Sequence, residues 1–495
     1  MNQTDRSSRR RVLAGMAVAP PALLLARACG AAAPVAEAVS LPDFRKPEDP
    51  DDTAALARAF ASGRPVHAPG GRGSGPGGRY LVGNNGDAQL PSGATLFGDG
   101  PDRTVFARSY RGPAAFILHC DSGSPDRRRN ITGLRFRDLT FEDEVARRGF
   151  EEYSYLVMLN GVTDALFERV RFRGFRGDGL HLGSSTTSRT ERHNLDVIVR
   201  DCEFDGVSAN NRNAISIIDG ERIIIEGCRF LNVTRPGDGS AAVGDPMNPR
   251  TGLGQPGAID LEPNGDSFAI IRDVTIRRNR FSGGGGAAVS LLLTSNTVTR
   301  VPQSGIVIED NEVADRFGAF YAFGFAGDEA LRSDRGYGIT LRNNRVRGCT
   351  RPLIVAGIRG IDVVANRFAD CTEPLQLGYE RTCADLSLER NVIERVGGEV
   401  VPYGLWVRSS VDLAIRNNQF VDCGPPNGDS GIAIGFVAGE VRRVTLEANS
   451  FTAPAGRMQQ AVSVFRDVRL DRATLRVGRN EERLRGRSLR EALLG

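Results

Sequence analysis

Lysine is almost absent from this sequence. Of the 64 basic residues, Lys46 is the only lysine and all the others are arginine. Lysine is therefore excluded as the catalytic base of a site in the body of the chain. Tryptophan is equally scarce, since Trp406 is the only one. The Trp-Asp motif that marks many propeller blades is missing with it.

The sequence also lacks the cysteine spacings that are typical of metal sites, and it lacks long apolar segments. Eight cysteines are present, but no two have C-x2-C or C-x4-C spacing, so we expect no zinc site. After the first 33 residues no segment is long and apolar enough to cross a bilayer, so we expect no membrane span.

Net charge is missing from most of the chain. The formal charge is +4, and residues 1–33, with five arginines and one aspartate, account for all of it. The remainder is close to neutral. Because nucleic acids are bound mainly through clustered basic residues, we expect no nucleic-acid partner.

The first 33 residues have the features of an export signal. Ser8-Arg9-Arg10-Arg11 precedes an apolar run from Ala14 to Ala26, and small residues follow. This order is typical of a secretory signal, and S-R-R-x-apolar-L resembles the twin-arginine export motif. We therefore expect a periplasmic or secreted protein. A membrane anchor is disfavoured because the run is short and contains two prolines. A lipid on Cys29 is disfavoured by Arg27.

The rest of the chain divides into three parts. We expect a linker and the first coils over residues 34–110, a repetitive body over 111–475, and a C-terminal cap over 476–495. Asp51-Asp52-Thr53 followed by A-A-L-A-R-A-F predicts an N-cap and a short capping helix. Ser488 to Leu494 predicts a second helix, which would cover the last coil and protect its open edge.

The body repeats one pattern. Its segments read roughly apolar-x-apolar-x-x-Z-x-Phe, and their final residues recur at intervals of 22 to 51 residues. A repeat of this kind indicates a solenoid or a propeller. The final residues are Phe141, Phe172, Phe204, Phe230, Phe281, Val313, Val346, Phe368, Ile393, Phe420 and Phe451.

The Z position, two residues before each end, decides between those folds. Stacked asparagines bond their amides to the backbone and to one another, forming a ladder along the axis. A propeller would need four antiparallel strands per blade. We therefore predict an all-β, right-handed parallel β-helix. The Z residues are Leu139, Val170, Cys202, Cys228, Asn279, Asn311, Asn344, Asn366, Asn391, Asn418 and Asn449.

The cysteines follow the same repeat. Cys202 and Cys228 occupy the Z column, and Cys349, Cys371 and Cys423 lie three residues after a segment end. Buried cysteine behaves as a small hydrophobic residue. We therefore expect these thiols to stack inward as free cysteines rather than to form disulfides.

A second set of strands lies between the first. Nine of its members align on four residues, of which the second and fourth are always apolar. Alternation along a strand then predicts that the third residue faces solvent. Down the axis this third residue reads His181, Ser216, Asp260, Ser290, Ile354, Gln376, Trp406, Ala433 and Ser463.

The stretch Gly257–Asn264, G-A-I-D-L-E-P-N, carries the most chemistry. Asp260 and Glu262 leave the same face, roughly 5 to 7 Å apart, and Asp178, two coils away, lies about 9 to 10 Å from Asp260. Glycoside hydrolysis needs one carboxyl as proton donor and another as base or nucleophile, and these separations span the retaining and inverting geometries. We therefore expect Asp260, Glu262 and Asp178 to be catalytic.

Neighbouring residues are expected to bind the substrate. The longest insert, 231–256, precedes Asp260, and other inserts at 142–152, 183–194 and 314–336 predict loops that wall a groove. The single tryptophan would stack on a sugar ring. The predicted substrate-binding residues are His181, Arg212, Asn213, Ser216, Asp219, Trp406 and Arg408.

Two other functions stay open. A polysaccharide lyase would use Arg212 or Arg408 as its base, with Asp260, Glu262 and Asp178 holding calcium beside an acidic sugar. Hydrolysis requires no metal and no cofactor. A non-catalytic glycan-binding or cell-surface protein is the third possibility, and a flat face without a groove around Asp260 would favour it. In every case the expected partner is a polysaccharide or oligosaccharide.

Two regions together resemble the pectate-lyase-like superfamily of right-handed parallel β-helices. They are D-D-T-A-A-L with L-P-S-G-A-T-L-F-G-D-G at residues 90–100, and the asparagine repeats. The resemblance covers nearly the whole mature chain and implies the fold. It names no reaction, since lyases, polygalacturonase-like hydrolases, epimerases and phage tailspikes share it. The polygalacturonase pattern N-T-D, D-D, G-H-G, R-I-K and the lyase motif W-I-D-H are absent, so no catalytic residue carries over.

Overall fold

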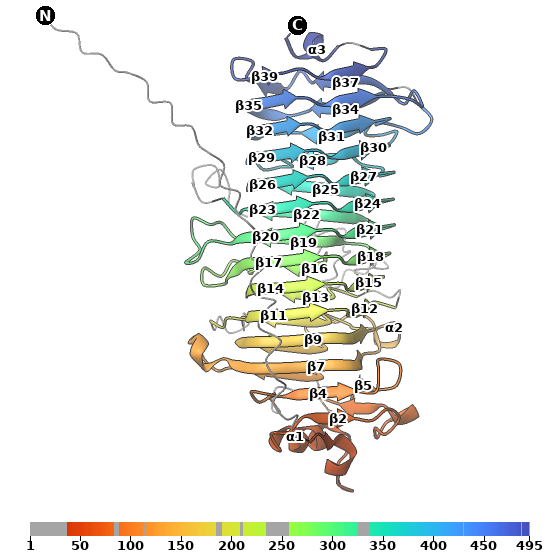
Figure 1. Cartoon of the computed structure of the whole chain (residues 1–495), viewed down its shortest axis with the longest axis vertical. Coiled ribbons are helices and arrows are strands. Elements are labelled where there is room, and N and C mark those ends of the chain that lie inside the picture. Colours follow the sequence, from red (N-terminus) through yellow and green to blue (C-terminus); the bar gives the residue numbers. More distant parts are fainter. Residues whose placement is uncertain are drawn as a thin grey trace, which may run out of the picture.

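The chain forms an elongated stack of parallel coils, with a helix at each end (Figure 1). The predicted export signal with Cys29, and insert residues 234–256, lie outside the described residues. The computed structural model describes residues 37–83, 89–112, 115–184, 191–207, 211–233, 257–324, 336–428, 430–486 and 488–494.

Within these residues, one face of the stack is a 12-stranded parallel sheet that carries one strand from each of twelve successive coils. The inner face of this parallel sheet is buried in the core. The second and fourth residues of each aligned strand point to that face, which explains why they are apolar. Its strands, in spatial order, are β6 (Leu118–Asp121), β8 (Val157–Asn160), β10 (Leu180–Gly183), β13 (Ile215–Ile217), β16 (Gly257–Leu261), β19 (Ala287–Leu293), β22 (Gly318–Gly324), β25 (Arg351–Ala356), β28 (Leu375–Leu377), β31 (Tyr403–Val407), β34 (Gly431–Phe436) and β37 (Met458–Val464).

The remaining strands form a larger parallel sheet that bends around the other faces. In the first full coils β7 (Ile131–Glu142) and β9 (Val162–Arg173) each run through the bend without a break. Later coils divide the same path into a longer strand and a short one. The longer strands are β11 (Leu195–Arg200), β14 (Gly220–Glu226), β17 (Ile271–Arg277), β20 (Ser304–Glu309), β23 (Ile339–Arg342), β26 (Arg359–Val364), β29 (Cys383–Glu389), β32 (Ser410–Arg416) and β35 (Gly439–Glu447).

The short strands carry the predicted repeat ends. All eleven predicted end residues pair in register from one coil to the next. Their phenyl rings stack along the axis; those of Phe172 and Phe204 lie 4.6 Å apart and nearly parallel. The short strands are β12 (Glu203–Asp205), β15 (Arg229–Leu231), β18 (Arg280–Ser282), β21 (Glu312–Ala314), β24 (Arg345–Arg347), β27 (Arg367–Ala369), β30 (Val392–Glu394), β33 (Gln419–Val421) and β36 (Ser450–Thr452).

The asparagine column forms the predicted ladder. The Nδ2 of Asn366 donates to Asn391 Oδ1 at 3.1 Å and to the Leu341 carbonyl at 2.9 Å, while its own Oδ1 accepts from the backbone N–H of Asn344. Every member from Asn279 to Asn449 repeats this pattern. Asn480, which the sequence alignment missed, extends the ladder by one coil. Buried backbone groups at the bend are satisfied in this way.

The predicted caps are present. Helix α1 (Thr53–Ala61) covers the first coil, and α3 (Leu489–Leu494) covers the last, with Leu489 and Leu493 in the core. Asp52 is the N-cap residue, but its side chain makes no cap bond. It accepts instead from Ser74 and from the Leu81 N–H, which fixes the Gly-rich turn. The cysteines of the described chain are free and buried, as predicted.

The second set of strands is corrected in two respects. Three of its members, β6, β8 and β22, escaped the sequence alignment. The segment at 431–434 was aligned two residues too early, because Trp406 pairs with Gly435 and Gly435 with Ser463. Ala433 is consequently a core residue. Glycine at the true position left no pattern that marked the register.

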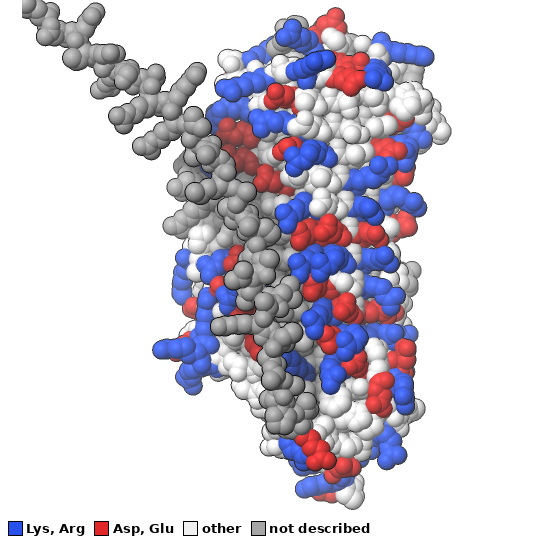
Figure 2. Space-filling model, in the orientation of Figure 1, with Lys and Arg blue, Asp and Glu red and all other residues white. Residues whose placement is uncertain are grey.

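The surface carries both signs of charge in alternation. Figure 2 shows arginines and carboxylates interspersed along successive coils, and pairs such as Arg169–Asp138 and Arg443–Asp412 bridge adjacent coils. Exposed pairs of this kind each contribute about 0–1 kcal/mol. In the described part of the chain, no helix is long and apolar enough to cross a membrane.

Candidate functional site

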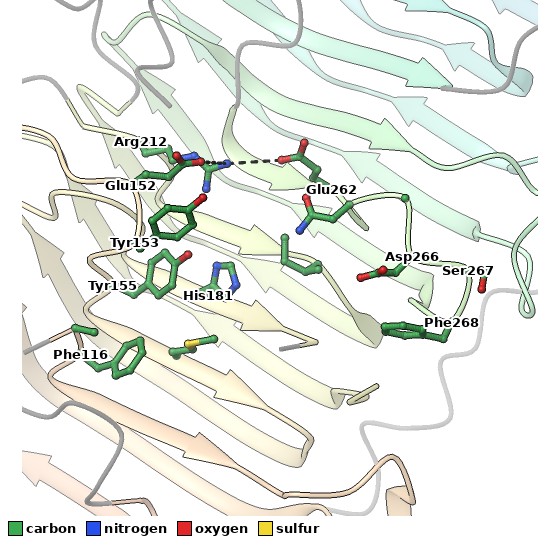
Figure 3. Close-up of a pocket in the computed structure, with 15 residues that line it drawn as sticks. Phe116, Glu152, Tyr153, Tyr155, His181, Arg212, Glu262, Asp266, Ser267 and Phe268 are labelled. Atoms are coloured by element: carbon green, nitrogen blue, oxygen red, sulfur yellow. Dashed lines mark ion pairs between the residues drawn. The ribbon is translucent and has the colours of Figure 1, made fainter. Parts of the chain in front are cut away.

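A groove of about 860 Å³ lies over the outer face of the 12-stranded sheet (Figure 3). It extends from Phe116, just before β6, to the turn that follows β16. Its aromatic wall comprises Phe116, Tyr153, Tyr155 and Phe268. Its charged and titratable lining comprises Glu152, His181, Arg212, Glu262 and Asp266. A groove therefore surrounds the region in which the sequence placed the site.

The predicted vertical neighbours are confirmed, but their exposure is not. His181 pairs with Ser216, and Ser216 pairs with Asp260, on adjacent strands. The sequence predicted that these side chains face solvent. They are buried instead: Asp260 and Ser216 are each 1% exposed and His181 is 6% exposed. Alternation tells which face a side chain leaves, but not what covers that face.

Asp178 orients His181. The His181 Nδ1 lies 2.9 Å from Asp178 Oδ2, and the imidazole stacks on Tyr155 at 4.3 Å between ring centroids. A carboxylate on one ring nitrogen fixes the tautomer and directs the other nitrogen away from it. Asp178 itself is completely buried and does not line the groove. Its position supports a role behind His181 rather than contact with substrate.

Arg212 joins the carboxylates on both sides of the groove. Its Nη1 lies 3.4 Å from Asp178, and its Nη2 lies 3.7 Å from Glu262 and 3.8 Å from Glu152. Burial alone would lower the pKa of Arg212, but these neighbours outweigh it and raise the pKa. Burial likewise opposes ionisation of Asp178, yet the charge of Arg212 and the His181 hydrogen bond hold its pKa below the ordinary value.

A buried polar relay connects Asp178 to Asp260. The Ser216 hydroxyl hydrogen-bonds to Asp178. The Asn213 Nδ2 donates to Ser216 Oγ at 2.8 Å and to Asp260 Oδ2 at 3.2 Å. Asn213 and Ser216 were predicted to bind substrate, but both are buried and do not line the groove. The structure brings them to the site as supports of the two aspartates.

Asp260 lies directly behind Glu262. The two carboxyl groups influence one another's ionisation, and both are influenced by Arg212. Burial raises the pKa of Asp260 well above its ordinary value, and the charge of Glu262 raises it further. Burial also raises the pKa of Glu262, although Arg212 partly offsets this. Because ionisation of one carboxyl disfavours ionisation of the other, the two acids titrate together.

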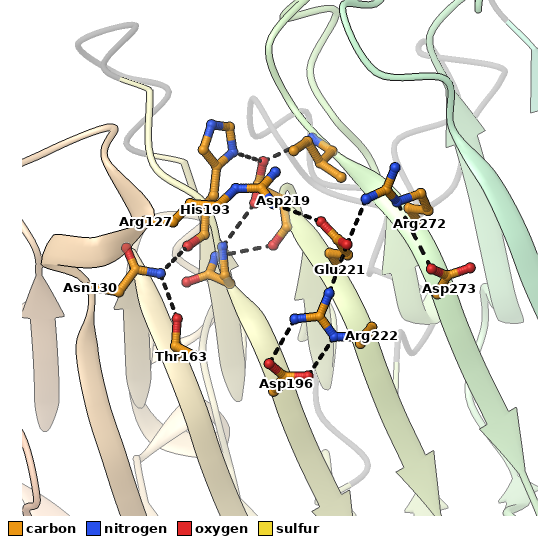
Figure 4. Close-up of polar contacts among 12 residues, drawn as sticks. Arg127, Asn130, Thr163, His193, Asp196, Asp219, Glu221, Arg222, Arg272 and Asp273 are labelled. Atoms are coloured by element: carbon orange, nitrogen blue, oxygen red, sulfur yellow. Dashed lines mark hydrogen bonds and ion pairs between the residues drawn. The ribbon is translucent and has the colours of Figure 1, made fainter. Parts of the chain in front are cut away.

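Asp219 belongs to a different network, outside the groove (Figure 4). It accepts from the backbone N–H groups of Asn194 at 2.9 Å and Ile270 at 2.8 Å, and His193 Nδ1 lies 3.0 Å away. Burial raises the pKa of Asp219. These contacts join three successive coils at the edge of the sheet. Asp219 therefore stabilises the packing of these coils, whereas the sequence predicted that it binds substrate.

Trp406 and Arg408 also lie away from the groove. Strand β31 is five strands beyond β16, on the order of 24 Å along the stack. There the Arg408 guanidinium lies 5.2 Å from the Trp406 ring and 5.1 Å from the Tyr379 ring. The structure does not bring these two residues to the Asp260 cluster. The prediction that they bind sugar stays a prediction about a separate surface.

The residues proposed to hold calcium do not fit a metal ion. The guanidinium of Arg212 occupies the space between Asp178 and Glu262, where the cation would have to bind. Asp260 resists ionisation, whereas calcium ligands are carboxylates. Among the described residues no group of three histidines, cysteines or carboxylates is arranged to hold a metal. We derive no chemistry through calcium.

Several groove residues escaped the sequence reasoning. Glu152 ends the insert at 142–152, which was predicted to wall the groove but not to supply chemistry, and Tyr153 follows it directly. Tyr155 follows just before β8, a strand that the alignment missed. Asp266 and Phe268 lie in the turn after β16. Only the insert's length marked this region, because loop residues carry no repeat signal.

Comparisons with known proteins agree with the fold. The family model described as "Right handed beta helix region" matches residues 257–465. No curated protein sequence matches the chain. With the pairing above, these findings define a right-handed parallel β-helix repeat protein.

Three solved structures illustrate the likeness. The N-terminal fragment of bacteriophage φ29 gene product 12 has 14% identity and a TM-score of 0.55, over 91% of this chain and 72% of that one. Tailspike protein 3 of bacteriophage CBA120 has 15% identity and a TM-score of 0.52, over 89% and 61%. The A-module of the Azotobacter vinelandii mannuronan C-5 epimerase AlgE6 has 11% identity and a TM-score of 0.45, over 88% and 98%. At these identities the likeness concerns the fold alone.

Proposed function

We propose that this protein is an exported glycoside hydrolase that binds a polysaccharide in the groove and cleaves it beside Glu262. The observation that carries the proposal is the pairing of Glu262 and Glu152 about one guanidinium. Both contact Arg212 Nη2, at 3.7 and 3.8 Å, so their oxygens lie no farther apart than the sum of these distances. That bound admits the retaining separation of about 5 Å and the shorter part of the inverting range, about 6.5–9.5 Å.

Glu262 is the proton donor in this proposal. Burial raises its pKa, which favours the protonated form of the carboxyl, and its side chain remains 28% exposed at the groove. The proton passes to the glycosidic oxygen as the bond from that oxygen to the anomeric carbon breaks. Asp260, behind it, is a positioning residue, since it contacts Glu262 and not the groove. This changes the role that the sequence suggested for Asp260.

Glu152 supplies the second carboxylate. In the inverting course it takes a proton from the water that attacks the anomeric carbon, and the products are two shorter chains with one new reducing end. In the retaining course it attacks that carbon itself, and water then releases the sugar. The aromatic wall, Tyr153 with Phe116 and Phe268, offers apolar faces for the sugar rings.

A second chemistry is favoured by the dyad of Asp178 and His181. A histidine oriented by a carboxylate is a general base, and Tyr155 stacks on the same ring. Together they suit removal of a proton from a sugar carbon, as a lyase requires. An arginine base is disfavoured, because the raised pKa of Arg212 keeps it charged. A non-catalytic binding protein is disfavoured by the presence of a groove, since a flat face was its expected sign.

The test is incubation with a panel of polysaccharides, with reducing ends and unsaturated sugars recorded together. Hydrolysis yields reducing ends without unsaturation, and elimination yields both. Glu262→Gln should abolish the reducing ends, while Glu312→Gln, an exposed glutamate on β21, serves as the matched control. Products that persist undiminished in Glu262→Gln would remove this site from consideration.

A further inference from the structure

A second surface lies on the same 12-stranded sheet as the groove. It consists of Tyr379, Tyr403, Trp406, Arg408 and Phe465, which we call the aromatic platform. Three of these residues belong to β31 or follow it directly, and β31 is five strands beyond β16 in the same sheet (Figure 1). The strand spacing places the platform on the order of 24 Å from Asp260 along the stack. None of its residues lines the groove.

The Tyr403 ring connects two other rings of the platform. Its centroid lies 6.0 Å from that of Trp406 and 6.1 Å from that of Phe465. The Tyr403 ring packs over Gly435 of β34, where a Cβ would come within 2.6 Å of it. Phe465 is 43% exposed and Trp406 is half-buried. Exposed aromatic rings of this kind offer apolar area to a ligand.

The Arg408 guanidinium lies beside two of the rings, 5.2 Å from Trp406 and 5.1 Å from Tyr379. Within the described chain it forms no ion pair and donates no hydrogen bond, and its Nε is buried without an acceptor. Arg351 on β25, by contrast, is paired with Glu373 at 3.0 Å. The platform therefore carries a positive charge that no described carboxylate contacts.

Two further polar atoms at the platform lack partners. Gln376 pairs in register with Trp406 on the adjacent strand and is 5% exposed. Its Nε2 donates to Glu373 at 3.2 Å, but its Oε1 has no donor, and Trp406 Nε1 has no acceptor, among the described residues. Buried polar groups without partners are costly. Hydroxyl groups both donate and accept hydrogen bonds, so a sugar chain supplies both kinds of partner.

We propose that the aromatic platform is a second glycan-binding site, which holds an acidic polysaccharide through a uronate carboxylate on Arg408 and through sugar rings on Trp406 and Tyr379. The planar fork of a guanidinium matches the two oxygens of a carboxylate, and this charge-assisted pairing is stronger than a neutral hydrogen bond. A neutral chain keeps the ring contacts and loses the ion pair. The platform is additional to the groove and shares no residue with it.

The test uses the fluorescence of Trp406, the only tryptophan in the chain. Selective excitation of tryptophan reports on the platform and not on ligand bound in the groove. Full-length Glu262→Gln is titrated with hexamers of galacturonate, glucuronate and mannuronate, and with the methyl-esterified form of the hexamer that binds most tightly. We expect a saturable change in emission with at least one hexuronate, and at least about tenfold weaker binding of its ester. Because salt screens exposed charges, this preference should shrink at high ionic strength.

Two variants in the Glu262→Gln background locate the charge. Arg408→Gln keeps the reporter and should weaken hexuronate binding at least about tenfold, with little effect on the ester. Arg342→Gln, on β23 of the other sheet, removes the same charge from a half-exposed side chain and should leave the affinity unchanged.

Three outcomes would overturn the proposal: no saturable change with any hexuronate, equal affinity for acid and ester, or unchanged affinity in Arg408→Gln. Calorimetry on the same samples separates this inference from the proposed function. Heat of binding without a change in Trp406 emission would place the glycan away from the platform, and it would leave cleavage in the groove untouched. Loss of the cleavage proposal would likewise leave a fluorescence response at the platform intact.

Discussion

Asp260 and Glu262 are two residues apart on one strand and its exit, yet they occupy different environments. Asp260 is 1% exposed behind the groove, whereas the side chain of Glu262 keeps 28% of its surface at the groove and contacts Arg212. The charge of Glu262 raises the pKa of Asp260, beyond the effect of burial. Asp260 therefore lies behind Glu262, and of the two only Glu262 lines the groove.

Glu262→Gln should lower kcat by a factor of about 100 or more, because a positioned general acid contributes about 10²–10⁴. The amide keeps the shape and loses the proton. The measurement is release of reducing ends under substrate saturation. Thermal unfolding of the same variant should stay close to that of the wild type. If kcat changes by less than about threefold, Glu262 is not the acid.

His181→Ala separates the two chemistries. If the enzyme is a hydrolase, His181 only lines the groove, and kcat should fall by less than about tenfold. If proton removal from a sugar carbon is the reaction, the loss should match that of a general base, about 10²–10⁴. Tyr155→Phe gives a second readout, because it keeps the ring that stacks on His181 and removes the hydroxyl. A large loss in both variants would favour the lyase.

Arg212→Met should destabilise the fold at neutral pH by about 3–5 kcal/mol, since it leaves Asp178 as a buried charge without its partner. The pH dependence of this effect is set by the titration of Asp178. Arg212 lowers the pKa of Asp178 in the folded state. The stability contributed by the Arg212–Asp178 pair is therefore present above the unfolded-state pKa of Asp178 and is lost as pH falls through its folded-state pKa. The difference in the free energy of unfolding between variant and wild type should therefore become smaller at acid pH. Urea unfolding at several pH values measures this difference.

The control for Arg212→Met is Arg443→Met. Arg443 pairs with Asp412, and both side chains are more than one third exposed. An exposed pair contributes about 0–1 kcal/mol. A loss at Arg443 as large as that at Arg212 would contradict the assignment of Arg212 as a buried partner.

Asp260→Asn should have the opposite effect to Arg212→Met, making the protein more stable than the wild type at higher pH. Burial and Glu262 raise the folded pKa of Asp260, so the folded state holds its proton more tightly than the unfolded chain. The wild type then loses stability as pH rises from the unfolded pKa, about 3.9, toward the raised folded value. The asparagine has no proton to lose. Its melting temperature should equal the wild type's in acid and exceed it at higher pH, with Asp273→Asn as control.

Asn366→Ala tests the ladder. The substitution leaves the backbone N–H and the Nδ2 of Asn344 without their acceptor. We expect a loss of about 1–3 kcal/mol for each buried group left unpaired. Asn480→Ala removes the last, partly exposed rung and should cost less, because water replaces the lost partner. Equal losses at both rungs would contradict a role for burial in the ladder.

Much of the fold was predictable because each coil requires similar residue types at the same positions. The Phe column and the asparagine column were read correctly from Phe141 to Phe451, since a ladder needs one residue type at one bend in every coil. Strand β22 and the register of β34 were missed where the aligned residues, Tyr321 and Gly435, did not follow the pattern. The register of a coil can be predicted from sequence only where its residues match the repeat pattern.

The site was predictable in part. Three vertical neighbours, His181, Ser216 and Asp260, followed from the register of adjacent coils. Their burial did not follow, because Tyr155, which stacks on His181, and Arg212, which pairs with Asp178, come from connecting segments whose sequences carry no period. Asp219 was predicted beside His181, Ser216 and Asp260, yet it accepts hydrogen bonds from backbone N–H groups of the neighbouring coils and lies outside the groove.

The sequence by itself determined the coil path, the inward and outward faces, and the coils on which the acids lie, because these follow from a period of two along strands and from stacking between them. Only the tertiary structure decided which acids meet the groove. That depended on Glu152, from a loop more than a hundred residues before Glu262, and on Arg212, which contacts both. Contacts of this kind join side chains from different loops, and no local pattern encodes their distance or the pKa values that result.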